Sequence, residues 1–462
     1  MQWRKLLCIG RPMVLSASIF SVLPVLADEP AKPKAEPAAA EAPAGNAAVK
    51  PKSIAEKTQK GLAYIVNQQQ ASGGWGQGGG WRTATQGGRV EGAEAQDTAD
   101  VGNTAIAMLA LIRGGHTPKE GEYAKNLAKG VEFIAAKINK VEKDSPFVTD
   151  VLGTQIQSKI GQYVDTFLAG LVLSELKGKM PDETSEKRLV AALDRTMAKI
   201  EKHQKADGTF AGNSGWASVL SQALCSKAIN RAAQNGVEIR AEVLQRDAQL
   251  AAAGVDVKKG DFAPAAVAGE VAGVAAGRTL AGGRVAAGGA GAASAPSDAG
   301  VNIYKFSAQA GGLQDAVNTT RPAAQQAQRV LADAAASSDD KARANETLAR
   351  ARTLEEANEA ATNGILKRLD DKAFIAGFGN NGGEEFLSYM NISETLLVKG
   401  GKEWQSWDKS ICENLHRVQN EDGSWSGHHC ITGRTFCTAT ALLTLMADRA
   451  PVPLAAKVRG SE

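Results

Sequence analysis

One seven-residue motif occurs three times in this chain of 462 residues, at 69–75, 204–210 and 419–425. Each copy begins with glutamine, has glycine four residues later and ends on an aromatic residue six residues later. Each copy also follows one segment with helical apolar periodicity and precedes another, so the spacing predicts one supersecondary unit used several times. The shared positions are Gln69, Gly73 and Trp75, then Gln204, Gly208 and Phe210, then Gln419, Gly423 and Trp425.

The residue types of the motif indicate a structural role. Glycine allows a tight turn with positive φ, and the Ser or Asp before it can bond to local backbone groups. The aromatic ring can pack against a neighbouring helix, and the glutamine amide can bond to unpaired backbone groups at a helix end. We therefore interpret the motif as a structural element that joins helices, and propose none of its residues as catalytic.

The first 27 residues have the pattern of an export signal. Arg4, Lys5 and Arg11 accompany a short apolar stretch, and Ala27 ends a small-x-Ala cleavage site. The stretch is shorter than a typical transmembrane helix, which favours a cleaved signal peptide; a retained membrane anchor is the alternative. Removing the signal takes away three of the 53 Lys and Arg residues and none of the 50 Asp and Glu residues, so the mature chain is formally neutral. We expect an exported protein, periplasmic or extracellular, with no transmembrane segment and no nucleic-acid partner.

The mature chain divides by composition. Residues 28–52 are rich in Ala, Pro, Lys and Glu, which predicts a flexible linker. Helical periodicity over 53–232 and 340–450 predicts two helical parts, followed by a tail at 451–462. No segment alternates with period two for long, so we expect an all-α chain whose helices pack in pairs around a ring or a superhelix.

The two helical parts are separated by 233–339, which we interpret as an Ala/Gly-rich insertion that is partly disordered. Its segment 262–296 is mostly Ala and Gly, which opposes stable helix. A loop is the favoured interpretation of that segment, and a hydrophobic hairpin at a membrane is the alternative. The segment 323–369 has a helical composition with mostly Ala at its apolar positions, which predicts a long, thinly packed hairpin.

The motif and the helices expected after it, at 103–111 and 437–445, resemble the prenyltransferase/squalene-oxidase repeat of squalene–hopene cyclases and protein prenyltransferase β subunits. The resemblance covers about 53–225 and 365–450 and is lost in between. It implies an α/α toroid of the terpenoid cyclase type, in which inner and outer helices surround a central cavity.

The catalytic motifs of the resembled enzymes are missing. The chain has no Asp-x-Asp-Asp, which supplies the acid of the cyclases, and 97–100 spaces its two Asp residues differently. No Asp stands two residues before a cysteine, as the zinc site of the prenyltransferases requires, and the Cys-Gly-Glu-Gln of thioester toroids is also absent. The pairs at 339–340 and 370–371 are interpreted as solvated helix caps. The sequence therefore favours a protein without catalysis.

One cluster of histidines and cysteines could still form a metal site or a disulfide. His428, His429, Cys430 and Cys437 lie within ten residues, and Cys412 and His416 stand one helix earlier. Imidazole and thiolate are zinc donors, but the spacing is not a standard zinc pattern and an exported chain favours a disulfide. A disulfide between Cys430 and Cys437, free buried thiols and a metal site remain as alternatives, in that order.

Four tryptophans, Trp75, Trp81, Trp404 and Trp407, are candidates for an aromatic groove that takes a sugar or an isoprenoid, with core packing as the simpler interpretation. We expect an exported, non-catalytic protein that binds a small apolar ligand or an envelope protein through the cavity or a face of the toroid. The alternative is an isoprenoid-processing enzyme with an atypical acid or a zinc ion at His428, His429 and Cys430. No cofactor is expected under the first hypothesis.

Overall fold

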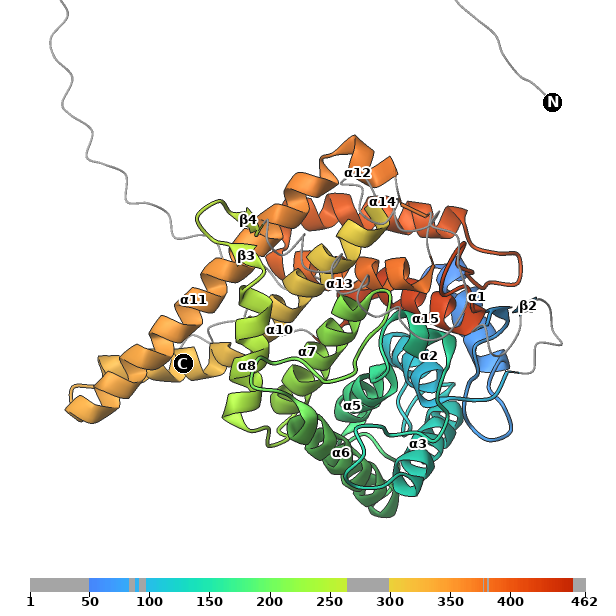
Figure 1. Cartoon of the computed structure of the whole chain (residues 1–462), viewed down its shortest axis with the longest axis horizontal. Helices are drawn as coiled ribbons and strands as arrows, with labels where there is room; N and C mark the ends of the chain where they lie inside the picture. Colours follow the sequence, from blue (N-terminus) through green and yellow to red (C-terminus); the bar gives the residue numbers. More distant parts are fainter. Residues whose placement is uncertain are drawn as a thin grey trace, which may run out of the picture. The chain divides into compact units, whose positions relative to one another are not determined.

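Long helices account for most of the chain in a computed structural model that describes residues 50–82, 88–90, 97–263, 299–376, 378–379 and 382–451 (Figure 1). All of them belong to one compact unit, Gly45–Glu462. The predicted signal peptide, most of the predicted linker, residues 264–298 of the insertion and all of the tail except Pro451 lie outside the described residues.

The described chain is mostly helical, which confirms the prediction that helices dominate the fold. None of the helices in the described ranges is both long and apolar enough to cross a membrane. The helices are α1 (Glu56–Asn67), α2 (Val101–Arg113), α3 (Ala124–Lys140), α4 (Gln155–Lys159), α5 (Val164–Leu176), α6 (Glu183–His203), α7 (Ser218–Gln234), α8 (Ala241–Ala252), α10 (Ala299–Ala332), α11 (Ser338–Leu369), α12 (Lys372–Ala376), α13 (Gly383–Lys399), α14 (Gly401–Arg417) and α15 (Arg434–Leu445), with a 3-10 turn η1 (Ala447–Arg449).

Two short antiparallel strand pairs add to the helices. β1 (Gly80–Trp81) pairs with β2 (Arg89–Val90), and β3 (Val255–Asp256) pairs with β4 (Asp261–Phe262). Each strand has only two residues, so no period-two pattern in the sequence could signal them.

Burial separates the helices into two kinds. Every residue of α5 is buried, as is nearly every residue of α2, α13 and α15. A helix that is buried all round must be surrounded by other elements. By contrast α1, α3, α6 and α14 bury one stripe each, which in α14 consists of Trp404, Trp407, Ile411 and Leu415. The first kind forms the interior and the second kind covers it.

α7 and the first half of α10 are also mostly buried and belong to the interior, and the interior helices contact one another in chain order. α2 packs on α5, α5 on α7, α7 on α10, α10 on α13 and α13 on α15, and α15 packs in turn on α2. Each outer helix packs on an interior one: α3 on α2, α6 on α5, α8 and α11 on α10, α14 on α13, and α1 on α15. The first and last helices of the described chain are therefore in contact.

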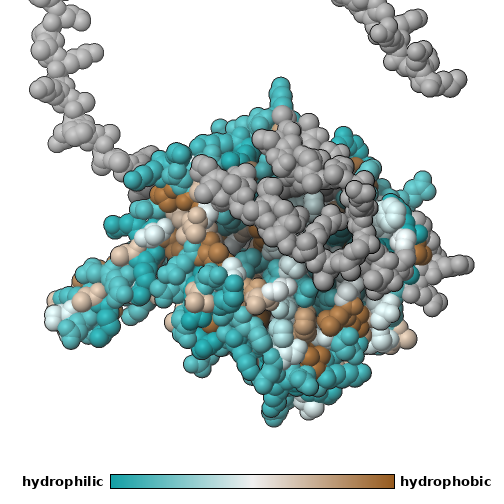
Figure 2. All heavy atoms as spheres, viewed as in Figure 1, coloured by the Kyte–Doolittle hydropathy of each residue, from teal (hydrophilic) through white to brown (hydrophobic). Residues whose placement is uncertain are grey.

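Two of these helices, α8 and α10, lie inside the range 233–339 that the sequence analysis interprets as an insertion. α10 places Ile303, Phe306 and Leu313 in the hydrophobic core, so this part of the range belongs to the protein interior. With α11 it forms a long hairpin whose far end extends away from the other helices (Figure 1) and has a mostly hydrophilic surface (Figure 2). Buried Ala327 and Ala344 let the two helices approach closely there.

The first and third motifs join three helices each, through the same kinds of bond. The Trp75 indole donates to the Ile65 carbonyl of α1 (2.6 Å), while its backbone N–H donates to Thr104 Oγ1 of α2 (2.9 Å). The Gln69 amide donates to the Asn126 carbonyl of α3 (2.9 Å). These bonds tie the first motif to α1, α2 and α3.

In the third motif the Trp425 indole donates to the Leu415 carbonyl of α14 (2.8 Å) and its backbone N–H to Thr438 Oγ1 of α15 (2.9 Å). Gln419 donates to the carbonyl of Lys57 in α1 (2.8 Å), 362 residues earlier in the chain. This motif therefore fastens the last helices to the first one.

The second motif follows the pattern with phenylalanine in place of tryptophan. Gln204 donates to the Val243 carbonyl of α8 (3.2 Å), and the Phe210 ring packs on Phe167 with a centroid distance of 5.1 Å. In all three copies the glycine has positive φ and faces a backbone carbonyl of an outer helix. A Cβ on Gly73, Gly208 or Gly423 would lie 2.6–2.8 Å from the carbonyl oxygen of Lys129, Arg246 or Lys60 respectively.

Candidate functional site

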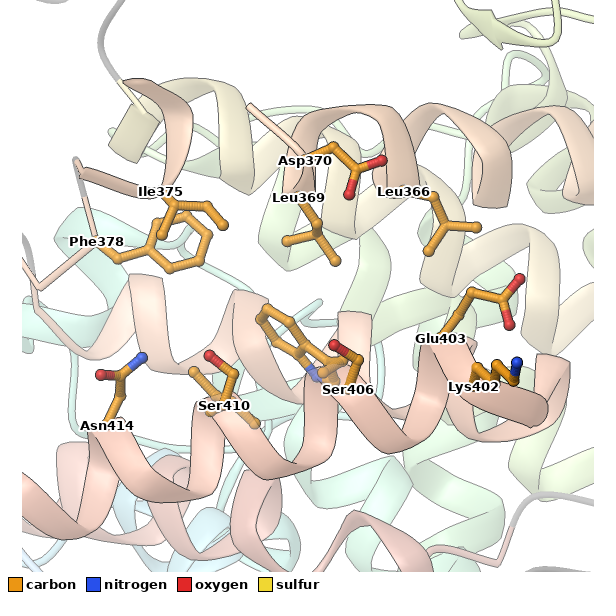
Figure 3. Close-up of a pocket in the computed structure, with 12 residues that line it drawn as sticks. Leu366, Leu369, Asp370, Ile375, Phe378, Lys402, Glu403, Ser406, Ser410 and Asn414 are labelled. Carbon is orange, nitrogen blue, oxygen red and sulfur yellow. The ribbon is translucent and has the colours of Figure 1, made fainter. Parts of the chain in front are cut away.

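A pocket of about 500 Å³ opens between the C-terminal end of α11, α12 and α14 (Figure 3). Leu366, Leu369, Ile375 and Phe378 form one wall, and α14 supplies the other. The α14 wall has Trp407 and Ile411 at its base, and more polar side chains along its edge. The lining polar residues are Asp370, Lys402, Glu403, Ser406, Ser410 and Asn414.

The α14 wall follows from the helical pattern of that segment. Trp407 and Ile411 are four residues apart and therefore share one face. The Trp407 indole N–H donates to Ser393 Oγ of α13 (2.9 Å), which satisfies its polar atom and fixes the ring. Ile375, on the opposite wall, is 40% exposed. The pocket thus combines a rigid aromatic base with an apolar wall that still faces solvent.

Charges stand only at the edge of this pocket. Lys402, Glu403 and Asp370 are exposed, and Glu403 pairs with Lys399 of the preceding turn (3.1 Å). Within the described residues, none of the carboxyl groups whose pKa burial raises lines the pocket. An apolar interior with a few polar groups at the rim is typical of sites that hold a small molecule, and it offers no buried acid for proton transfer.

The four tryptophan candidates are placed differently from one another. Trp407 lines the pocket, while Trp75 and Trp404 belong to the buried core. Trp81 is 42% exposed, and its backbone N–H donates to Thr432 Oγ1. Sequence reasoning missed the other wall, since Leu366 and Phe378 come from separate segments whose apolar residues give no sign that they face α14.

The Cys/His cluster is only partly brought together. His429 Nδ1 lies 2.8 Å from Cys430 Sγ, and Cys437 donates to the Ile431 carbonyl (3.3 Å). Cys430 is the one residue other than glycine with positive φ (58°) in the described chain. The structure has Cys430 and Cys437 as free thiols, so the expected disulfide between them is absent from it. Cys412 and His416 lie elsewhere, against Asp408 and Thr58.

A buried carboxyl group adjoins this cluster. Glu384 Oε2 accepts the Ile431 backbone N–H (3.2 Å), and its Oε1 is buried without a hydrogen-bond partner. Burial raises the pKa of Glu384 to about 7, and burial together with Glu384 raises the pKa of Cys430 to about 12. A thiol that stays protonated is a poor nucleophile. Among the described residues, no group of three or more His, Cys, Asp or Glu side chains is arranged to hold a metal ion.

Six charged side chains pair in the interior between α2, α5, α7, α10 and α13. Arg113 binds Glu175 through both guanidinium nitrogens (2.5 and 2.8 Å), and Lys227 contacts Glu394 (2.6 Å) and Asp315 (3.0 Å). Arg231 lies 3.5 Å from Glu394 and 3.7 Å from Asp315. All six are buried, with three charges of each sign. Burial alone would raise the pKa of Glu394, but Lys227, Arg231 and Arg113 hold it well below its usual range.

The expected central cavity for an isoprenoid would have to lie among the same interior helices that hold this charge network. An isoprenoid chain requires an apolar lining, because it cannot satisfy buried polar groups. Between the interior helices, at Arg113 and Glu394, the buried side chains are instead paired charges, and Arg231 Nε is buried without a hydrogen-bond partner.

Two further buried carboxylates act as helix caps. Asp100 accepts the Asn103 backbone N–H (2.7 Å) at the start of α2, and Asp165 accepts the Gly102 N–H (2.8 Å) and the Gln157 amide (2.7 Å). Burial raises the pKa of both, and the charge of Asp165 raises that of Asp100 further. The segment 97–100 thus supplies a cap that orients α2.

Neither a scan against models of known protein families nor a search of curated proteins finds a match for this chain. The family resemblance accordingly rests on the three motifs and the helices that follow them.

Proposed function

We propose that this protein is an exported α/α toroid of the prenyltransferase/squalene-oxidase repeat type that binds a small apolar ligand and has no catalytic activity of its own. The observation that carries the binding proposal is the pocket of about 500 Å³ built on Trp407 and Ile411. Its volume lies in the range of small-molecule sites, and its apolar walls can shield most of such a ligand from water.

The toroid is supported by the order of the helix contacts. Six interior helices that contact one another in chain order, with α15 returning to α2, are what a closed ring of helix pairs requires. The third motif adds a direct bond from the end of the chain to α1. Export is supported by the signal pattern of residues 1–27 alone.

The absence of catalysis is supported by two observations. The buried charge network occupies interior space that an isoprenoid-processing enzyme would need for its substrate. The proposed ligand pocket has only exposed charges, so the acid that protonates an alkene would have to lie elsewhere.

Titration of the purified mature chain with farnesol and with dodecanol, followed by tryptophan fluorescence and calorimetry, tests the binding proposal. Trp407→Ala removes the base of the pocket and should weaken binding by a factor of about 10–100, which corresponds to roughly 1.5–3 kcal/mol of apolar contact. Ser410→Trp should fill the pocket from its exposed edge without disturbing the core. Trp81→Ala, a control outside the pocket, should bind as the wild type does. Binding that neither pocket variant changes would refute the site.

One observation favours the enzyme alternative. Burial raises the pKa of Glu384 to about 7, which suits a general acid, and its Oε1 has no hydrogen-bond partner. Incubation with squalene and with geranylgeranyl diphosphate, followed by mass spectrometry of the products, distinguishes the two functions. Turnover that Glu384→Gln abolishes while folding is retained would establish the enzyme. Unchanged substrates would support the binding function.

A further inference from the structure

A second pocket, of about 460 Å³, lies between α4, the turn that leads into α5 and the loop that precedes α7. It shares no lining residue with the α11–α12–α14 pocket. Its lining contains no charged side chain: Phe147 and Leu152 are its large apolar members, and Gln157, Ser158, Gln162 and Ser214 its polar ones.

The polar side chains of this pocket differ in what they can offer a ligand. Gln157 already has hydrogen-bond partners within the protein. Its amide oxygen accepts from the Gly153 N–H, and its amide nitrogen donates to Asp165 and to the Val151 carbonyl. Ser158, Gln162 and Ser214 are exposed, and their side chains make no hydrogen bond within the described ranges. Two hydroxyls and one amide are therefore available, and each can both donate and accept.

Large exposed apolar residues belong to this lining or follow it directly in the sequence. Leu152 is 54% exposed and belongs to the pocket lining. Trp216, which directly follows the lining residue Gly215, is 41% exposed. The flat face of an indole suits a flat, partly apolar partner.

We propose that this pocket binds a neutral oligosaccharide. Sugar hydroxyls donate and accept as Ser158, Gln162 and Ser214 do, and the C–H face of a sugar ring matches the Phe147 ring of the lining and the indole of the adjoining Trp216. A charged ligand would find no counter-ion in the lining, and a wholly apolar ligand would leave buried hydroxyls and an amide unpaired. An extended peptide would lack a strand edge to pair with, since no lining residue belongs to a strand.

The experiment is calorimetric titration of the mature chain with uncharged hexasaccharides (of glucose, mannose and N-acetylglucosamine), with hexagalacturonate and with hexa-alanine. We expect at least one neutral hexasaccharide to bind, and Trp216→Ala and Gln162→Ala each to weaken it roughly tenfold or more. Trp81→Ala is the matched control, because Trp81 is exposed to the same extent (42%) away from this pocket. Circular dichroism verifies that each variant is folded.

Three results would overturn the proposal. One is that no neutral hexasaccharide binds. The second is that hexagalacturonate or hexa-alanine binds in preference to all of them. The third is that neither Trp216→Ala nor Gln162→Ala weakens the binding, or that Trp81→Ala weakens it as much as they do. Because this pocket and the Trp407 pocket are separate, Trp407→Ala should leave oligosaccharide binding unchanged, and either proposal can fail alone.

Discussion

The third motif offers the sharpest test of how the helices are held together. Gly423 has φ of +88°, and a Cβ there would lie 2.7 Å from the carbonyl oxygen of Lys60 in α1. Gly423→Ala therefore adds two costs. The left-handed backbone costs about 1–2 kcal/mol for an L-residue, and displacing a backbone carbonyl in a packed interface costs about 1–3 kcal/mol more.

Gly178→Ala is the matched control for this substitution. Gly178 also has positive φ (+80°), but a Cβ there would meet nothing within 4 Å. It should cost about 1–2 kcal/mol, from backbone strain alone. We therefore expect Gly423→Ala to lower the free energy of unfolding by about 2–5 kcal/mol, more than the control does.

Equilibrium unfolding in guanidinium chloride, monitored by circular dichroism and tryptophan fluorescence, measures both variants. Gly73→Ala and Gly208→Ala face Lys129 and Arg246 in the same way and should resemble Gly423→Ala. If Gly423→Ala and Gly178→Ala proved equally destabilising, close contact between the motif and α1 would not stabilise the fold, and the structural role of the motif would be refuted.

Two buried carboxyl groups give predictions of opposite pH dependence in urea unfolding. Burial raises the pKa of Glu384 from its ordinary value near 4.5 to about 7. Its contribution to stability is therefore present below pH 4.5 and is lost as the pH rises through 7. Glu384→Gln should match the stability of the wild type at pH 4 and exceed it at pH 8 by about 3 kcal/mol. Equal stability at pH 8 would contradict this. The pKa of Glu394 is lowered by its cationic partners despite burial, so its contribution is present above its ordinary pKa and is lost as the pH falls below it. Glu394→Gln should cost about 3–5 kcal/mol at pH 7, with a gap from the wild type that narrows in acid; a gap that does not depend on pH would show that the ion pairs are not its cause.

The sequence predicts the helices well where their apolar residues are large. In α14 the stripe of Trp404, Trp407, Ile411 and Leu415 follows the helical period, and the structure buries that stripe. It predicts α10 poorly, because Gly and Ala dominate the surrounding composition and hide the buried Ile303 and Leu313. Composition alone could not show that part of the expected insertion belongs to the interior.

The interior ion pairs and the pocket could not be predicted from the sequence, because the residues that form them are far apart in the chain. Arg113 and Glu175 are 62 residues apart, and Lys227 and Glu394 are 167 apart. In the sequence each is one charged residue within a helical segment, and nothing nearby in the sequence identifies its partner. The cluster at 428–437 was visible because its residues are close in sequence, but proximity in sequence did not predict that Glu384 would be the buried group beside Cys430.

The two ends of the helical chain meet where α1 packs on α15, and a zero-length cross-link tests this closure directly. Lys52 Nζ lies 2.7 Å from Asp408 Oδ1, 356 residues away. A carbodiimide should therefore couple these side chains within one molecule, and mass spectrometry of a mixture of ¹⁴N- and ¹⁵N-labelled protein should find the cross-linked peptide in singly labelled form. Asp408→Asn should remove it. A cross-link found only between differently labelled molecules, or none while other contacting pairs such as Lys137 and Asp150 are coupled, would contradict the closure of the chain.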